Sequence, residues 1–181
     1  HGVFGAPNQA GHAHCDLFSF ELTLDDLRLI VDPGVHSYHD PVQRHLSRTS
    51  SAHCTPSIDG IDQAEIWKSF RVGWKPKLQS SDWRQISDGW TFSGTALAFG
   101  PKDAREIQRT LRLEGDRVTV CDSIEGATVF QVALPLHPDV QVAPDATDPQ
   151  SWLLSRGDQS VQVRISRGSS TVEQGIVSHR F

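Results

Sequence analysis

The chain has 181 residues, enough for one domain of ordinary size with a complete hydrophobic core. Its 37% hydrophobic and 22% charged residues are typical of a globular protein, and no apolar run reaches the roughly 18–20 residues that span a bilayer. The formal net charge of −5 argues against a nucleic-acid partner, although a local basic cleft would still allow an anionic substrate.

The beginning of the chain and its cysteines say little about its compartment. It begins at His1, contains no Met and shows no signal-peptide pattern, so we expect residues 1–181 to be a single domain from a larger protein. Three Cys allow at most one disulfide and do not form a disulfide framework.

The first third of the chain predicts short strands separated by one polar loop. Residues 17–23 alternate in character, and residues 27–31 form an apolar run that ends at Asp32-Pro33-Gly34. Residues 33–52 are polar and predict a loop. Residues 53–58 predict a further strand.

The remainder of the chain predicts more short strands and no long amphipathic helix. Residues 61–99 carry four of the five Trp, in short segments between turns, and we expect these rings to pack in the core or on a sheet, with contact to a ligand as the alternative. The clearest hairpin spans residues 107–124, and another turns at Arg156-Gly157-Asp158. Many short strands at such spacing favour an all-β antiparallel sandwich or barrel.

Histidine is concentrated near the N-terminus, where seven of the nine His lie at or before position 53: His1, His12, His14, His36, His39, His45 and His53. On an extended strand His12 and His14 would share one face, since residues i and i+2 point the same way.

Asp32 ends the strand that returns toward His14, so the two would meet at one rim of the sheet. His53 would complete a His–His–Asp metal site with an open fourth position. The alternatives are solvated rim histidines and, for Asp32, an ordinary Asp-Pro-Gly turn.

The cysteines are expected to be apolar packing residues. Cys15 and Cys54 each follow a candidate ligand, so alternation turns them away from it toward the opposite face. Both are then buried small side chains rather than ligands. Cys121, inside the 107–124 hairpin, is predicted to be a core residue.

Five motifs in order resemble the C-terminal part of heparinase II/III-like proteins. Residues 11–22 resemble the signature GHxHxDxxSFEL, residues 29–34 resemble LIVDPG, and residues 48–55 resemble RSTxAHNT. Two later elements follow, at Asp59-Gly60 with Gln63, Glu65 and Trp67, and at residues 134–138. The series covers about 135 residues, and its order makes it specific.

The resemblance implies an antiparallel multi-stranded β-sandwich that follows an N-terminal α/α toroid, which this chain lacks. It implies a polysaccharide lyase that cleaves uronic-acid-containing polysaccharide by β-elimination, in the periplasm or outside the cell. The partners implied are an acidic polysaccharide or oligosaccharide and the toroid of the same protein, without which the domain is expected to be inactive.

The resemblance also assigns roles to individual residues. His12 matches an acid/base or substrate-activating histidine, and His14, Asp32 and His53 match the ligands of a divalent metal, usually zinc, that organises the active-site wall. Tyr38, the only Tyr, is a second catalytic candidate or an ordinary loop aromatic. Arg48 would bind a sugar carboxylate or sulfate, or else pin its own loop. Cys54 departs from the family pattern, which has Asn there.

Two other functions remain open at this point. The domain would be a non-catalytic carbohydrate-binding or assembly module that keeps its metal, or a different metal-dependent hydrolase that uses metal-bound water. The formation of unsaturated uronate, binding without turnover, and turnover by the isolated domain without that product distinguish the three.

Overall fold

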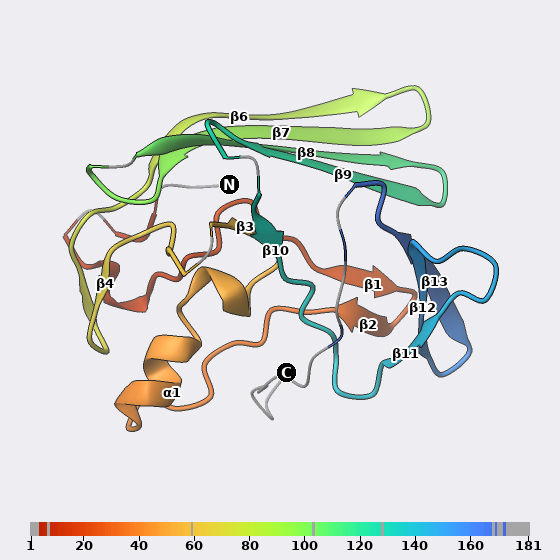
Figure 1. Ribbon diagram of the computed structural model, residues 1–181, viewed down its shortest axis with the longest axis horizontal. Helices are drawn as coiled ribbons and strands as arrows, with labels where there is room; N and C mark the ends of the chain where they lie inside the picture. The colour runs from red at the N-terminus through yellow and green to blue at the C-terminus, as the bar shows by residue number, and fades with distance from the viewer. Residues whose placement is uncertain are drawn as a thin grey trace.

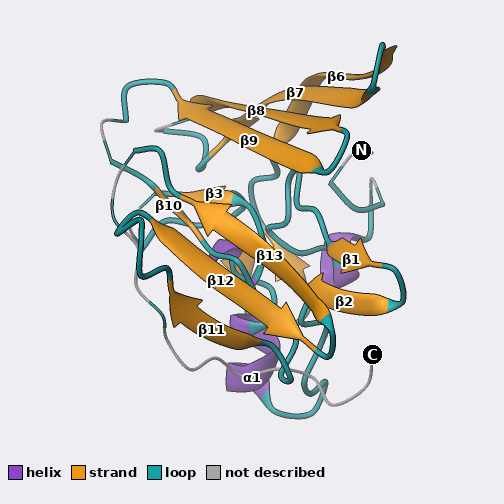
Figure 2. Cartoon of the chain, turned by 90° about the vertical axis from the view of Figure 1, so that its right-hand side faces the viewer, coloured by secondary structure: helices purple, strands orange, loops and turns teal. Residues whose placement is uncertain are grey.

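The computed structural model describes residues 4–6, 8–58, 60–102, 104–127, 129–167, 169 and 172. Strands dominate, and every sheet is antiparallel. A four-stranded sheet forms one layer, and smaller sheets form a second layer that faces it (Figures 1 and 2). The predicted all-β, antiparallel sandwich is therefore confirmed.

The four-stranded sheet follows the order β6-β7-β8-β9. Its strands are β6 (Lys77–Ile86), β7 (Gly89–Ala98), β8 (Arg105–Glu114) and β9 (Arg117–Ile124). The β8–β9 register runs from Ile107 opposite Ile124 to Glu114 opposite Arg117, which confirms the predicted hairpin. The prediction of short segments over residues 61–99 was wrong in its second half, where β6 and β7 are ten residues long.

The second layer is assembled from several short pieces. β1 (Leu22–Leu24) pairs with β2 (Leu27–Ile30), β3 (Pro56–Ser57) pairs with β10 (Gln131–Val132), and β11 (Gln141–Pro144), β12 (Ser151–Arg156) and β13 (Gln159–Arg164) form a three-stranded sheet. The β12–β13 hairpin confirms the turn predicted at Gly157. Arg156 ties this sheet to β2 by donating to the carbonyl of Arg28 at 2.9 Å.

The main core lies between the two layers. Phe18 fills its centre, with its ring 5.7 Å from that of Phe92 on β7. A Cβ at Gly94 would stand only 2.5 Å from the Phe18 ring, so the strand leaves this space for the phenyl group. Phe18 has a φ of 58°, and the chain turns there instead of continuing as a strand. The predicted 17–23 strand is therefore wrong, apart from the part that forms β1.

The predicted loop over residues 33–52 contains helical turns. α1 (Pro41–Leu46) begins with Asp40 as its N-cap, whose Oδ1 accepts from the backbone N–H groups of Val42 and Gln43 at 2.8 and 3.1 Å. Pro at the first helical position completes this start signal. A 3-10 turn, η2 (Ser50–Ala52), lies at the end of this region, and another, η1 (Ala10–His12), lies nearer the N-terminus. None of the helices in the described ranges is long and apolar enough to cross a membrane.

Three tryptophans lie half-exposed on sheets. Trp67, on the two-stranded hairpin of β4 (Ile66–Trp67) and β5 (Arg71–Val72), is 52% exposed, and Trp83 and Trp90 on the large sheet are 60% and 47% exposed. Of the two predicted positions, core or sheet, these three rings take the sheet. Trp83 lies opposite Phe92 across β6 and β7, and the centres of the two rings are 5.1 Å apart.

Candidate metal centre

Separate hydrogen bonds to a backbone carbonyl and to a side chain, rather than a strand ladder, hold the segment that carries His12 and His14. The amide N–H of Cys15 donates to the carbonyl of Arg48 at 2.9 Å, and that of Leu17 donates to Gln63 Oε1 at 3.0 Å. The predicted strand with His12 and His14 on one face is therefore wrong. These two rings diverge, and each meets a different group of side chains.

His14, Asp32 and His53 come together, although not along a common strand. The rings of His14 and His53 lie 5.1 Å apart, and His53 Nδ1 donates to Asp32 Oδ2 at 2.9 Å. Asp32 lies two residues after the end of β2, and His53 directly follows η2. The predicted strand over residues 53–58 was wrong except at β3, because the chain bends where the N–H of Thr55 donates to the carbonyl of His53 at 2.8 Å.

Electrostatics favour the metal-binding protonation states of His14 and Asp32. Burial lowers the pKa of His14 to about 4, and the nearby His53 ring and Arg44 guanidinium add to that effect, so the His14 imidazole is neutral. Burial acts to raise the pKa of Asp32, but the hydrogen bonds from His53 and from the N–H of Gly34 outweigh it and lower the pKa overall. A neutral imidazole and an ionised carboxylate are the forms that ligate zinc.

Two imidazoles and a carboxylate suit a divalent metal in their chemistry, although the three side chains are not spaced to surround an ion. No three His, Cys, Asp or Glu side chains of the described residues form a ready metal cage. His53 Nε2 is buried and has no hydrogen-bond partner in the described structure. It points away from Asp32, because Nδ1 faces Asp32 Oδ2 at 2.9 Å, so an ion held by both residues would take the place of the Nδ1 proton.

Arg44 is a central member of the site that the sequence reasoning missed. Its side chain is fully buried, with NH1 3.2 Å from His14 Nε2 and NH2 donating to the carbonyl of Gly11 at 3.0 Å. Its guanidinium carbon also lies 4.9 Å from the centre of the Tyr38 ring. The Asp40-Pro41 pair, a helix start signal, is a local hint that Arg44 lies on a helix and not in a loop.

His12 and Tyr38 form a second, more exposed group beside the first. Their ring centres lie 5.9 Å apart, and Phe70 contacts both at 5.8 and 6.3 Å. Tyr38 is 49% exposed. The predicted catalytic pair is thus brought together on the same side of the molecule as the candidate ligands, with Arg44 between the two groups.

Arg48 is placed differently from a residue that contacts substrate. Its side chain is fully buried, and it donates to the carbonyls of Ala13 and Ser69 at 2.9 Å and of Ala10 at 3.3 Å. This geometry fits the alternative role, in which Arg48 pins the N-terminal segment against the β4–β5 turn. The prediction of sugar contact has no support in this arrangement.

Burial favours the neutral forms of the neighbouring carboxyl and thiol groups. Burial raises the pKa of Asp16, which lies near His53 and Asp32. Burial likewise raises the pKa of the Cys15 thiol to about 12 and that of Cys54 to about 11, so neither is a thiolate ligand. The predicted burial of both cysteines is confirmed, and both are free, whereas Cys121 is exposed on edge strand β9, so its predicted core position is wrong.

Comparison with known proteins gives one match. No curated protein and no solved structure matches the chain. The family model described as "Heparinase II/III-like, C-terminal" matches residues 1–181, which is the whole chain. The match agrees with the motif series and with the antiparallel sandwich, and the chain therefore belongs to the heparinase II/III-like family as its C-terminal domain.

Proposed function

We propose that the domain is the sandwich half of a polysaccharide lyase that cleaves uronic-acid-containing polysaccharide by β-elimination. One observation carries the proposal: the His12–Tyr38 pair lies next to the His14, Asp32 and His53 group, with Arg44 touching members of both. Family membership supports a lyase, and this geometry supplies proton-transfer groups beside a rigid polar wall.

The reaction needs two proton transfers and no hydrolytic water. A base takes the proton from C5 of the uronate, the C–H electron pair forms the C4–C5 double bond, and the C4–O bond breaks as an acid protonates the leaving glycosidic oxygen. His12 and Tyr38 are the groups of this chain that would exchange these protons. Their ring contact places an imidazole and a phenol within one sugar unit of each other.

We propose that His14, Asp32 and His53 hold a divalent metal, with zinc as the best match to two imidazoles and a carboxylate. When bound, the ion supplies a fixed positive charge that keeps the active-site wall rigid. Arg44 couples this wall to the catalytic pair, because its guanidinium contacts His14 and the Tyr38 ring at once.

The complete activity is expected to need the α/α toroid of the same protein, since the cleft of such lyases lies between toroid and sandwich. The isolated domain would then have little or no turnover. A polymeric acidic substrate also favours a periplasmic or secreted location, which remains part of the proposal.

Elemental analysis of the 181-residue chain tests the metal, beside His14→Ala, Asp32→Ala and His53→Ala, with His45→Ala on α1 as the matched control. We expect about one zinc per chain in the parent and the control, and loss in the other three. An apo parent prepared without chelators would refute the metal site and leave the fold unaffected.

Activity is tested on the chain joined to its toroid. Formation of a 4,5-unsaturated uronate, followed by its ultraviolet absorbance, is expected to fall roughly 10²–10⁴-fold in His12→Ala and Tyr38→Phe. Binding without turnover would instead indicate a carbohydrate-binding or assembly module. Metal-dependent turnover by the isolated domain without unsaturated product would indicate a hydrolase.

A further inference from the structure

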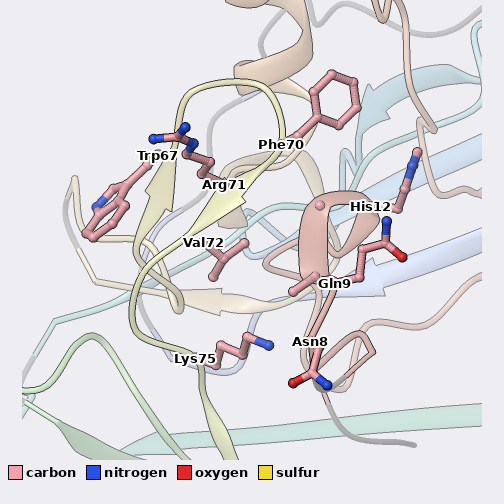
Figure 3. Close-up of a pocket in the computed structure, with 10 residues that line it drawn as sticks. Asn8, Gln9, His12, Trp67, Phe70, Arg71, Val72 and Lys75 are labelled. Atoms are coloured by element: carbon pink, nitrogen blue, oxygen red, sulfur yellow. The ribbon is translucent and has the colours of Figure 1, made fainter.

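A cleft of about 460 Å³ opens beside His12, between the η1 segment and the β4–β5 hairpin (Figure 3). This volume lies within the range of roughly 300–1,000 Å³ that small-ligand sites occupy. Trp67 and Arg71 are direct cross-strand partners on the hairpin, so both side chains stand on the same face. His12 lies at the η1 side of the cleft, so a ligand there would adjoin the proposed catalytic pair.

Two glycines let the walls of the cleft approach closely. A Cβ at Gly11 would stand 2.9 Å from the carbonyl oxygen of Phe70, so only glycine lets η1 lie against the hairpin turn. A Cβ at Gly73 would stand 2.2 Å from Glu65 Oε2 and 2.7 Å from Cζ2 of the Trp67 indole. Glycine there leaves room for both groups, the Glu65 carboxylate accepting from the N–H of Trp74 at 3.0 Å and the indole remaining 52% exposed.

The charge of the cleft is opposite to that of the whole chain. Arg71 and Lys75 line it together with the amides of Asn8 and Gln9, and none of its lining residues is Asp or Glu, although the chain carries a net charge of −5. Arg71 is exposed and pairs with no carboxylate of the described residues. Lys75 donates to the carbonyl of Ala6 at 3.3 Å, which holds its ammonium at the wall.

We propose that this cleft is a binding subsite for one anionic sugar unit, adjacent to the unit on which His12 acts. The Trp67 indole would stack on the apolar face of the sugar ring, and Arg71 and Lys75 would bind its carboxylate or sulfate. The inference rests on the proposed function and deepens it, because it assigns substrate recognition to the β4–β5 hairpin, a segment distinct from the candidate metal ligands.

Calorimetric titration of the full 181-residue chain tests the subsite. The probes are hexasaccharides of polygalacturonate, alginate, chondroitin sulfate and heparan sulfate, with cellohexaose as the neutral control. Trp67→Ala and the double variant Arg71→Gln/Lys75→Gln are each expected to weaken the best anionic probe at least tenfold, or about 1.4 kcal/mol. The double variant should also reduce the salt dependence of binding.

Matched controls come from the large sheet. Trp83→Ala removes a similarly exposed indole, and Arg84→Gln/Arg117→Gln removes two exposed cations, and none of these residues lines the cleft. Both controls should change the affinity less than twofold, and thermal unfolding of every variant verifies that it is folded. A folded Gly73→Ala variant should weaken binding as well, because its methyl group would displace the indole, together with the Glu65 carboxylate, without removing it.

The outcomes separate the subsite from the proposed function. Tight anionic binding by the parent that survives in both cleft variants would overturn the subsite and leave the lyase assignment standing. If the Arg71→Gln/Lys75→Gln variant lost affinity equally for cellohexaose and for the anionic probe, the two cations would not recognise the negative charge of the sugar. A parent chain that binds none of the four anionic probes would count against both the subsite and substrate binding by this domain.

Discussion

The four-stranded sheet and the segment from residue 10 to 75, called the irregular segment below, differ in what satisfies their backbone hydrogen-bonding groups. In the sheet, the backbone ladder satisfies its own hydrogen-bonding groups, and only alternate side chains need to be buried. The 10–75 segment has few ladder bonds, so side chains must satisfy its backbone. Of the nine buried polar or charged residues in the described structure, seven lie between residues 44 and 63: Arg44, Ser47, Arg48, Ser50, His53, Thr55 and Gln63.

The difference explains why the candidate site lies in the irregular segment. A ladder places side chains only at fixed spacing, whereas buried donors can hold loops so that groups distant in sequence converge. Gln63 illustrates this role, since its amide accepts from the N–H of Leu17 at 3.0 Å and donates to Thr55 Oγ1 at 2.7 Å. Stability in this segment should therefore depend on single polar side chains.

The largest effect is expected at Arg109, which connects the two regions. From β8 it forms a buried bidentate pair with Asp122 at 2.7 and 2.8 Å and donates to the carbonyls of Phe18 and Cys54. Arg109→Leu leaves a buried carboxylate unpaired, which should cost about 3–5 kcal/mol of unfolding free energy in urea titrations. Arg112→Leu, on the same strand but exposed, should cost under about 1 kcal/mol. Equal losses would contradict the contrast between the regions.

A smaller loss is expected for Arg48→Lys. An ammonium cannot reproduce the fork that reaches the carbonyls of Ala13, Ser69 and Ala10, so we expect about 2–3 kcal/mol less stability by the same titration. Saccharide affinity of the folded variant is the second readout. If affinity falls while stability is unchanged, Arg48 contacts the sugar and does not pin the loop.

Sequence reasoning was accurate for the sheet-forming hairpins because their signals are local. Residues 107–124 alternate around a Gly-containing turn, and the structure pairs them in that register. The same reasoning failed at Phe18, where alternation predicted a strand. That residue takes a positive φ because its ring enters the space above Gly94, a contact 76 residues away that no local pattern reveals.

For the site, the motifs identified which residues converge but not how. His14, Asp32 and His53 do meet, although the strand face that was expected to align His14 with His12 does not exist. Arg44 was missed because residues 33–52 were read as a loop. Its contact with His14 depends on a helix of six residues, whose Asp-Pro start was the only available signal.

Gly94→Ala tests the contact by which the irregular segment fits onto the sheet. The new methyl group would overlap the Phe18 ring, whose nearest atoms lie 2.5–2.8 Å from the Cβ position. Since Phe18 is buried on all sides, we expect a loss of about 1–3 kcal/mol by thermal or urea unfolding. Ser93→Ala, one residue away on the exposed face of the same strand, should change stability by under about 0.5 kcal/mol. A neutral Gly94→Ala would show that the ring can move.

The smallest effect on stability, and a clear contrast in reactivity, is expected at the cysteines. Cys15 and Cys54 are buried in the irregular segment, at 0% and 1% exposure, whereas Cys121 is exposed on β9. One of the three thiols should therefore react rapidly with a disulfide reagent in the native chain, and all three after denaturation. Cys121→Ser should remove the rapid phase while changing stability by under about 0.5 kcal/mol. Rapid reaction of a second thiol in the native chain would mean that the irregular segment opens far more readily than its buried hydrogen bonds imply. The side-chain hydrogen bonds around the candidate metal ligands would then be weaker than the backbone ladder of the sheet.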